Sequence, residues 1–328
     1  MQPDSLRGKR VLITGLTGMV GANLGRALLC SGNDVHAIIR AGSSRWRIAD
    51  MADDFVLHVA DLRDGDTVRK AVAEAKPEIL FHLATTRGSA SPDERLATMR
   101  TNVEGLQNLI EATAPLEYEA FVIAGSSLVY GKRDYPLSEN APLGPSGFYA
   151  ATRAAGVILA QQFGRSTGKP LSILRLFSVY GPWEAESRLI PTAILAALDD
   201  RPLRLTAPGF RRDLVFVDDV VDAFSRAATA TSLEPGELIN IGTGAQTANE
   251  ETVGIIERAC GKKIRLSPEE YPPRETDTDN WVADPSRATA SLGWKARHSV
   301  EEGIARTVDW MIENRAAYSN DSLALATQ

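Results

Sequence analysis

Residues 11–21 read VLITGLTGMVG, an apolar strand that runs into three glycines placed at every third position. With this spacing Gly15 permits a tight turn out of the strand, Gly18 lets the backbone approach a phosphate, and Gly21 lets the following helix pack closely. The N-terminus of that helix would face an anion with its free N–H groups. The stretch predicts a pyrophosphate cradle, although glycines at such positions also occur in an ordinary strand-turn-helix junction.

The sequence around this stretch alternates short apolar runs with longer helical patterns. The strand candidates are Val11–Thr14, Val35–Ile39, Val56–Val59, Ile79–Leu83, Phe121–Ala124 and Leu171–Leu176. This order predicts an α/β fold with a Rossmann-type, doubly wound parallel sheet.

The pattern changes after about Gly181, where prolines divide the chain into shorter elements and two helices are expected near Glu250–Ala259 and Val300–Asn314. We expect residues 1–181, with returning segments, to form a dinucleotide-binding domain. Residues 182–315 would form most of a smaller C-terminal substrate lobe, and residues 316–328 a polar tail.

Composition excludes several classes of function. A net charge of −6 over 328 residues argues against a general nucleic-acid surface. No run approaches the roughly 20 apolar residues that cross a bilayer, and the N-terminal residues show no apolar signal region, so we expect no membrane partner and a cytoplasmic protein. The four histidines are far apart in the sequence and lack metal-ligand spacing, so no metal site is expected.

The end of the second strand candidate bears on the choice of dinucleotide. An NAD site usually has a carboxylate there for the ribose hydroxyls, whereas this chain has Arg40. A guanidinium pairs well with a 2′-phosphate, and the nearby Ser43, Ser44 or Arg45 could assist it. We therefore expect NADP, with NAD as the alternative if Arg40 is only a solvated loop residue. Asp61 is placed to accept from the adenine amino group, or else caps the next helix.

A catalytic constellation is expected around Tyr149. This residue opens a helix as Tyr149-Ala150-Ala151-Thr152-Arg153, so Arg153 lies one turn along the same face. Ser126 follows the fifth strand candidate at the end that should meet the cofactor crevice. A tyrosinate beside a cation can remove a hydroxyl proton while hydride leaves the same carbon, and Ser126 can orient the substrate oxygen. By spacing alone, a tyrosine at such a position is more often a packing residue.

Across residues 9–315 the chain resembles the extended short-chain dehydrogenase/reductase family, the NAD-dependent epimerase/dehydratase group that acts on nucleotide sugars. The matching segments, in chain order, are residues 14–21 (TGLTGMVG), 61–62 (DL), 81–84 (FHLA), 102–105 (NVEG), the Ser126 segment, Tyr149, 175–182 (RLFSVYGP), 212–220 (RDLVFVDDV), 240–244 (NIGTG) and 292–294 (LGW).

The resemblance implies roles for individual residues. Ser126 and Tyr149 would take the catalytic roles together with Arg153. The expected cofactor contacts are Gly15, Gly18, Met19, Val20, Gly21, Arg40, Asp61, Leu62, Leu83, Ala84, Tyr149, Arg153 and Phe177. The expected substrate contacts are Thr85, Ser126, Ser127, Ser178, Arg188, Arg212, Arg274 and Asp277, with the three arginines for the diphosphate or its flanking sugar, although any one of them could simply be a solvated surface residue.

Two departures from the family pattern affect the expected chemistry. The family's helix reads Tyr-x-x-x-Lys, and this chain has Arg153 in place of the lysine, which keeps the charge but changes its geometry. Sugar 4,6-dehydratases of this family carry Thr-Asp-Glu where this chain has Ser126-Ser127-Leu128. Without those carboxylates an elimination of water lacks its acid and base.

These residues favour an NAD(P)-dependent oxidoreductase that moves hydride at a sugar carbon, most simply C4, so that the net reaction is epimerisation or ketone reduction. The alternatives are a nucleotide-sugar dehydratase and a non-catalytic dinucleotide-sensing protein. We expect a nucleoside-diphosphate sugar as the substrate and a homodimer as the assembly.

Overall fold

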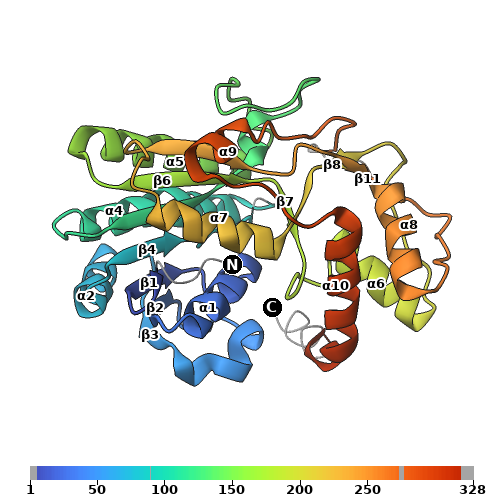
Figure 1. The fold of residues 1–328 in the computed structure, drawn as a ribbon, viewed down its shortest axis with the longest axis horizontal. Coiled ribbons are helices and arrows are strands. Elements are labelled where there is room, and N and C mark those ends of the chain that lie inside the picture. The colour runs from blue at the N-terminus through green and yellow to red at the C-terminus, as the bar shows by residue number, and fades with distance from the viewer. Residues whose placement is uncertain (1–5, 89, 273–276, 319–328) are drawn as a thin grey trace.

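The computed structural model describes residues 6–318, apart from Ser89 and residues 273–276. Its main feature is a parallel sheet of seven strands (Figure 1). In spatial order the strands are β10 (Glu237–Ile241), β6 (Leu171–Leu176), β5 (Ala120–Ser126), β4 (Ile79–His82), β1 (Arg10–Thr14), β2 (Asp34–Ile39) and β3 (Val56–Val59). The predicted doubly wound parallel sheet is confirmed, and all six strand candidates lie in it.

The order of the strands places the site. The chain winds outward from β1 to β3, returns to β4 on the other side of β1, and then continues to β5, β6 and β10. Thr14 pairs with His82, and His82 with Ile123, so the carboxyl ends of β1, β4 and β5 meet at one edge. This reversal next to β1 is where open α/β sheets bind ligands.

The seventh strand was not among the strand candidates. β10 pairs with β6 in parallel register, Glu237 with Ser172 and Ile241 with Leu176. It comes from beyond Gly181, so part of the chain's second half returns to the main sheet. Within its five residues, Glu237–Ile241, the polar Glu237 and Asn240 interrupt the apolar run, which weakens the sequence signal.

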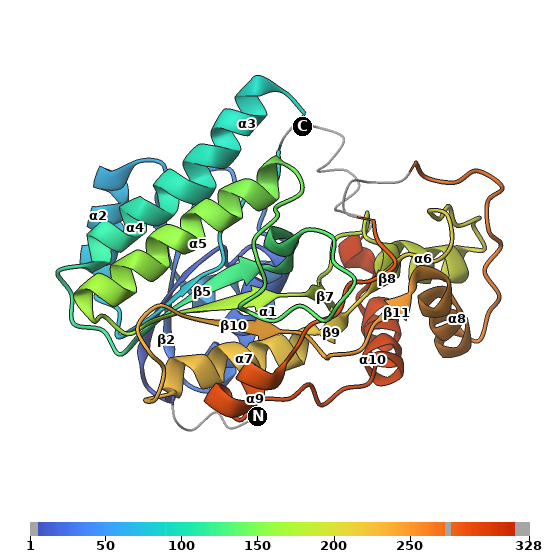
Figure 2. The ribbon, with the colours of Figure 1, turned by 90° about the horizontal axis from the view of Figure 1, so that it is seen from above.

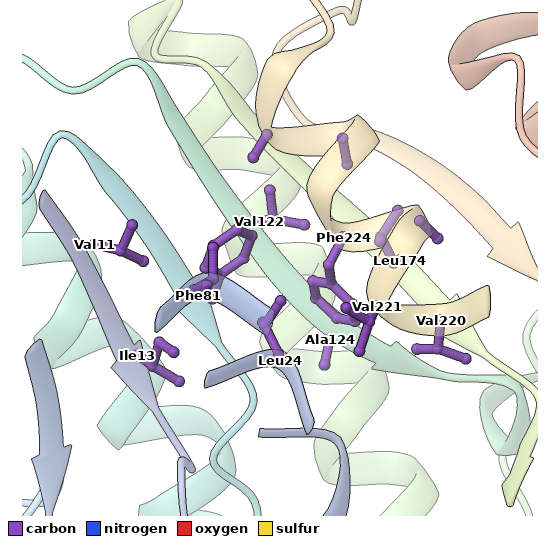
Figure 3. Packing of buried hydrophobic residues seen from close by; sticks show 14 of the residues in the cluster. Val11, Ile13, Leu24, Phe81, Val122, Ala124, Leu174, Val220, Val221 and Phe224 are labelled. Carbon is purple, nitrogen blue, oxygen red and sulfur yellow. The ribbon is translucent and has the colours of Figure 1, made fainter. Parts of the chain in front are cut away.

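Helices cover both faces of the sheet (Figure 2). One face carries α2 (Gly65–Ala75), α4 (Gly105–Thr113) and α5 (Phe148–Thr167), and the other carries α1 (Met19–Cys30), α7 (Val217–Thr229) and α9 (Ser286–Leu292). Each face has its own buried cluster. Between the sheet and α7, the rings of Phe81 and Phe224 meet edge to face at 6.0 Å (Figure 3).

A helical segment with an irregular centre leads from β4 to β5. It consists of α3 (Pro92–Met99), a π-helical turn η3 (Arg100–Glu104) and then α4. π-Turns inside helices are frequent at functional sites. The segment η2 (Trp46–Asp54), before β3, and the segment η4 (Ser127–Tyr130), after β5, are 3-10 helical.

The smaller lobe lies beyond the carboxyl edge of the sheet (Figure 1). It contains α6 (Leu189–Asp199), α8 (Asn249–Cys260) and α10 (Val300–Glu313) around a separate buried cluster. Two short two-stranded sheets accompany them, β7 (Ser178–Tyr180) with β9 (Leu214–Phe216), and β8 (Arg211–Arg212) with β11 (Thr247–Ala248). Of the expected tail, Tyr318 is buried beside Trp46 and Trp310, and residues 319–328 lie outside the described residues.

Candidate active site

The glycine-rich loop between β1 and α1 is closely packed against the backbone after β4. Gly15 has φ +81°, and a Cβ there would lie 2.6 Å from the Ala84 nitrogen. A Cβ on Gly21 would lie 2.1 Å from the Gly15 carbonyl oxygen. Side chains are therefore excluded at both positions.

The start of α1 suits an anionic ligand. The helix begins directly after Gly18, which is exposed, and it has neither a side-chain cap nor an acidic residue in its first turn. Met19 and Val20, which form that first turn, are half-buried. Backbone N–H groups at such an end are unpaired within the helix and favour negative charge. The cradle therefore fits the pyrophosphate of a dinucleotide.

At the expected adenosine end, Arg40 is exposed immediately after β2. Asp61 is engaged by Arg63, whose Nε donates at 3.0 Å and whose terminal nitrogen lies 2.6 Å from Oδ2. The hydrogen bond from the Arg63 side chain is the main reason why the pKa of Asp61 is lowered, and Arg40 adds to it. Arg63 therefore competes for the carboxylate oxygens that an adenine amino group would use.

Tyr149 lies in the first turn of α5 and is half-buried. Burial raises the pKa of Tyr149. The charges of Arg153 and Arg87, and side-chain hydrogen bonds with Thr85 and Arg87, lower it by more, so the net pKa is lowered. The Arg87 guanidinium carbon lies 4.7 Å from the centroid of the Tyr149 ring. The phenol therefore has the electrostatic surroundings of a proton-transfer group.

Arg153 points into the protein from the same face of α5. Its side chain is buried, one guanidinium nitrogen donates to the backbone oxygen of Ala124 in β5, and its Nε has no hydrogen-bond partner in the structure. Burial lowers the pKa of Arg153. Tyr149 offsets part of this effect, and the net pKa is below its usual value. The neighbouring His82 is also fully buried, and burial followed by the charge of Arg153 lowers its pKa to about 3. His82 is neutral at physiological pH, so Arg153 is the cation below Tyr149.

Asn102, in the π-turn η3, joins α5 to the loop after β4. Its Oδ1 accepts from the Thr85 hydroxyl and the Thr86 N–H, each at 3.0 Å. Its Nδ2 donates to the Thr86 oxygen and the Thr152 hydroxyl, also at 3.0 Å. Thr152 in turn donates to the Tyr149 carbonyl oxygen. Asn102 lies in one of the matching motif segments but was not among the expected site residues, because its burial and its four hydrogen bonds depend on the fold.

The two serines after β5 have different surroundings. Ser126 ends β5, and its Oγ accepts from the Leu128 N–H at 3.3 Å. Ser127 is buried, and its Oγ accepts from the indole N–H of Trp281 at 3.3 Å. The Ser126 hydroxyl keeps its own proton for another acceptor. This hydrogen bond joins η4 to the segment around Trp281, 154 residues later in the chain, and no local sequence pattern predicts it.

Of the expected diphosphate and sugar contacts in the second half of the chain, Arg212 and Asp277 lie together and Arg188 lies apart from them. Arg212 donates to Asp277 at 2.9 Å and lies 5.9 Å from the Trp281 ring, so this pair is linked through Trp281 to Ser127. Arg188 is exposed at the start of α6, where its Nε lies 3.5 Å from Glu184. Arg274 lies outside the described residues.

The remaining expected contacts line the edge of the sheet or pack within it. Leu83 and Ala84 follow β4, half-buried, where they meet Gly15. Leu62 and Phe177 are buried in core clusters, and Ser178 begins β7 with its N–H bonded to the Asp213 oxygen. Any contact of Leu62 or Phe177 with a cofactor would therefore involve backbone or a side-chain edge.

The fold brings together two histidines that are distant in the sequence. His36 Nδ1 lies 2.9 Å from His58 Nε2, and the rings stack at 5.2 Å. Within the described part of the chain, no three His, Cys, Asp or Glu residues are arranged to hold a metal ion. The described helices also include none that is long and apolar enough to cross a bilayer.

Comparison with known proteins gives consistent matches. The NAD dependent epimerase/dehydratase family matches residues 11–242. UDP-glucose 4-epimerase of Mycolicibacterium smegmatis is 33% identical, with 92% of this chain and 98% of the relative covered. The dTDP-glucose 4,6-dehydratase of Neisseria meningitidis serogroup B is 28% identical, with 95% and 96% covered. The structure of Thermus thermophilus UDP-glucose 4-epimerase in complex with NAD has a TM-score of 0.82 and 29% identity, covering 92% of this chain and 99% of that one.

Proposed function

Because the chain belongs to the NAD dependent epimerase/dehydratase family, an enzyme family of the extended short-chain dehydrogenase type, we propose that it epimerises a nucleoside-diphosphate sugar at C4. The observation that carries this proposal is Tyr149, held at the carboxyl edge of the sheet with a lowered pKa and with Arg153 beneath it. The Mycolicibacterium smegmatis relative is a UDP-glucose 4-epimerase.

In the proposed reaction Tyr149 takes the proton from the C4 hydroxyl and later returns it to the C4 oxygen. Ser126 donates a hydrogen bond to that oxygen, because its Oγ already accepts from Leu128 and its proton points elsewhere. Arg153 stabilises the phenolate while the proton is on the sugar side. A nicotinamide dinucleotide bound in the glycine cradle would supply the hydride acceptor and donor.

Dehydration is the less favoured reaction. It needs an acid and a base beside the sugar, and the residues after Ser126 are Ser127 and Leu128 rather than carboxylates. Ser127 is also committed to Trp281. A dehydratase relative exists, but the groups that this reaction requires are absent at these positions.

For the cofactor we propose NADP on the basis of Arg40. It is exposed after β2, at the position where NAD sites carry a carboxylate. NAD is the alternative, because the Thermus thermophilus relative is in complex with NAD. Either dinucleotide would place its pyrophosphate over Gly15, Gly18 and Gly21.

We also propose a homodimer that uses the outer side of α3 and α5. Ile158 and Leu159 on α5 are 52% and 41% exposed, and Leu96 and Met99 on the adjacent α3 are 52% and 45% exposed. Exposed apolar residues gathered on neighbouring helices are typical of an interface between subunits.

The test of the proposed chemistry is Tyr149→Phe with UDP-glucose as the substrate. Removing a group that acts only in the transition state lowers turnover without changing ground-state binding. We expect kcat to fall by about 10²-fold or more, with the dinucleotide affinity measured by calorimetry nearly unchanged. A variant that keeps half of the wild-type turnover would exclude Tyr149 as the acid/base.

A further inference from the structure

The loop after β4 brings a second cation to Tyr149. Arg87 lies in this loop, with its guanidinium carbon 4.7 Å from the centroid of the Tyr149 ring. This distance is within the range in which a guanidinium and an aromatic ring attract each other. Arg87 was not among the expected site residues, because no local pattern relates it to Tyr149, 62 residues further along the chain.

Arg87 is held in place by anchors on both sides. Before it, Thr85 and Thr86 are bonded to the buried Asn102, which also binds Thr152 one turn from Tyr149. After it, the Gly88 oxygen accepts from the Thr98 hydroxyl at 2.5 Å. The loop is therefore fixed against α5 and α3, so the approach of Arg87 to Tyr149 is built into the fold.

Arg153 acts on Tyr149 from the interior side, so a second cation can act on it from the loop side. Its guanidinium is turned inward to the Ala124 oxygen of β5, and its side chain is fully enclosed. Its charge acts on the phenol from the interior, through the first turn of α5. Arg87, in contrast, is an exposed residue and acts from the loop side.

We propose that Arg87 is a positioning residue for the proposed reaction, which stabilises the Tyr149 phenolate jointly with Arg153. This rests on the proposed function, in which Tyr149 carries the proton. An opposite charge within about 4–6 Å favours the ionised form of a phenol. Arg153, from the interior, and Arg87, from the loop, thus together supply the positive charge that stabilises the phenolate.

The electrostatic surroundings of Tyr149 agree with this division. Burial raises its pKa, and the charged groups that lower it are Arg153 from its own helix and Arg87 from the loop. A hydrogen bond with the Thr85 side chain, in the same loop, also lowers it. His82, which faces Arg153 from β4, is neutral and adds no charge.

The test is an ultraviolet titration of tyrosinate in the purified protein without substrate, with Tyr149→Phe subtracted to isolate the Tyr149 signal. Burial raises the pKa of Tyr118, Tyr130 and Tyr180, so these ionise at higher pH. In Arg87→Ala we expect the pKa of Tyr149 to rise by about one unit. Arg87→Lys should recover about half of that rise, because it restores the charge without the planar group.

The matched control is Arg165→Ala, which removes the same charge from an exposed position in the last turn of α5. At about 1.5 Å per residue it lies roughly 24 Å along the helix from Tyr149. Its titration should match the wild type. An unchanged pKa of Tyr149 in Arg87→Ala, or an equal rise in Arg165→Ala, overturns the proposal.

Kinetics with UDP-glucose provide a second readout. The acidic limb of the kcat/KM profile should move upward in Arg87→Ala by the same amount as the titration. A change in KM with an unmoved pH profile would mean that Arg87 only contacts substrate, and would overturn the proposal. If the wild type does not turn over UDP-glucose, the proposed function fails, whereas the titration still decides the role of Arg87.

Discussion

Arg153 donates a hydrogen bond to the backbone oxygen of Ala124, so the cation beneath Tyr149 is bound to the end of β5. This contact joins α5 to the strand that ends at Ser126. The three proposed catalytic residues are thus held by one helix and one strand, and rigid elements maintain such geometry better than loops do.

The first prediction concerns Arg153 itself. If it substitutes for the lysine of the family pattern, Arg153→Lys keeps or raises kcat, because the charge beneath Tyr149 remains. Arg153→Ala removes that charge and the donor to Ala124, and we expect kcat to fall by about 10²-fold. Steady-state kinetics on both variants check this. A lysine variant far less active than the wild type would mean that the guanidinium fork has a role of its own.

The second prediction concerns Arg40 and the choice of dinucleotide. NADP(H) should bind more tightly than NAD(H), and Arg40→Asp should reverse that order, because a carboxylate accepts from ribose hydroxyls and repels a 2′-phosphate. Calorimetric titration of each dinucleotide measures the two affinities. Equal affinities in the wild type would remove Arg40 from the choice of cofactor.

The third prediction concerns Glu184, a buried carboxyl group beside Arg188. Burial raises its pKa from 4.5 to about 7. The folded chain therefore holds this proton more tightly than the unfolded chain, so stability falls as the pH rises from 4.5 through 7. Glu184→Gln has no carboxyl group to ionise at this position. Its free energy of unfolding, relative to that of the wild type, should therefore increase by about 3 kcal/mol between pH 4.5 and pH 8.

Denaturant unfolding at the two pH values measures this difference. Glu117→Gln makes the same change at a side chain that is 97% exposed and serves as the matched control. A Glu184→Gln variant whose stability parallels that of the wild type at both pH values would show that the carboxyl group stays ionised when buried.

The fourth prediction concerns assembly. Ile158→Glu places a charge on the exposed apolar side of α5 and should convert the proposed dimer to a monomer in light scattering. Leu143→Glu makes the same change at another exposed apolar residue, outside α3 and α5, and should leave the mass unchanged. A dimer that persists in Ile158→Glu would place the interface elsewhere.

The sequence predicted the parallel sheet because the strands and the glycines are local signals. Gly15 and Gly21 are required by contacts of 2.6 Å and 2.1 Å that their spacing anticipates. The strand β10 was missed because Glu237 and Asn240 interrupt its apolar run and because it pairs only with the distant β6.

The candidate site was predictable in its residue types but less so in their partners. Tyr149 and Arg153 share a face of one helix, which four-residue spacing dictates. The contacts of Arg87, Asn102 and Trp281 with the site join residues 50 or more positions apart, and no local pattern encodes them. Asp61 was expected to contact adenine or to cap the next helix. Its carboxylate binds Arg63, two residues along, and Asp64 is the residue that caps α2.

The most direct test of the account is the product formed from UDP-glucose and, separately, dTDP-glucose, followed by proton nuclear magnetic resonance with dinucleotide present. We predict that at least one sugar is converted to its C4 epimer, with no net change in the absorbance of the reduced dinucleotide. A 4-keto-6-deoxy sugar, or conversion that consumes reduced dinucleotide in step with product, would contradict the proposed epimerisation.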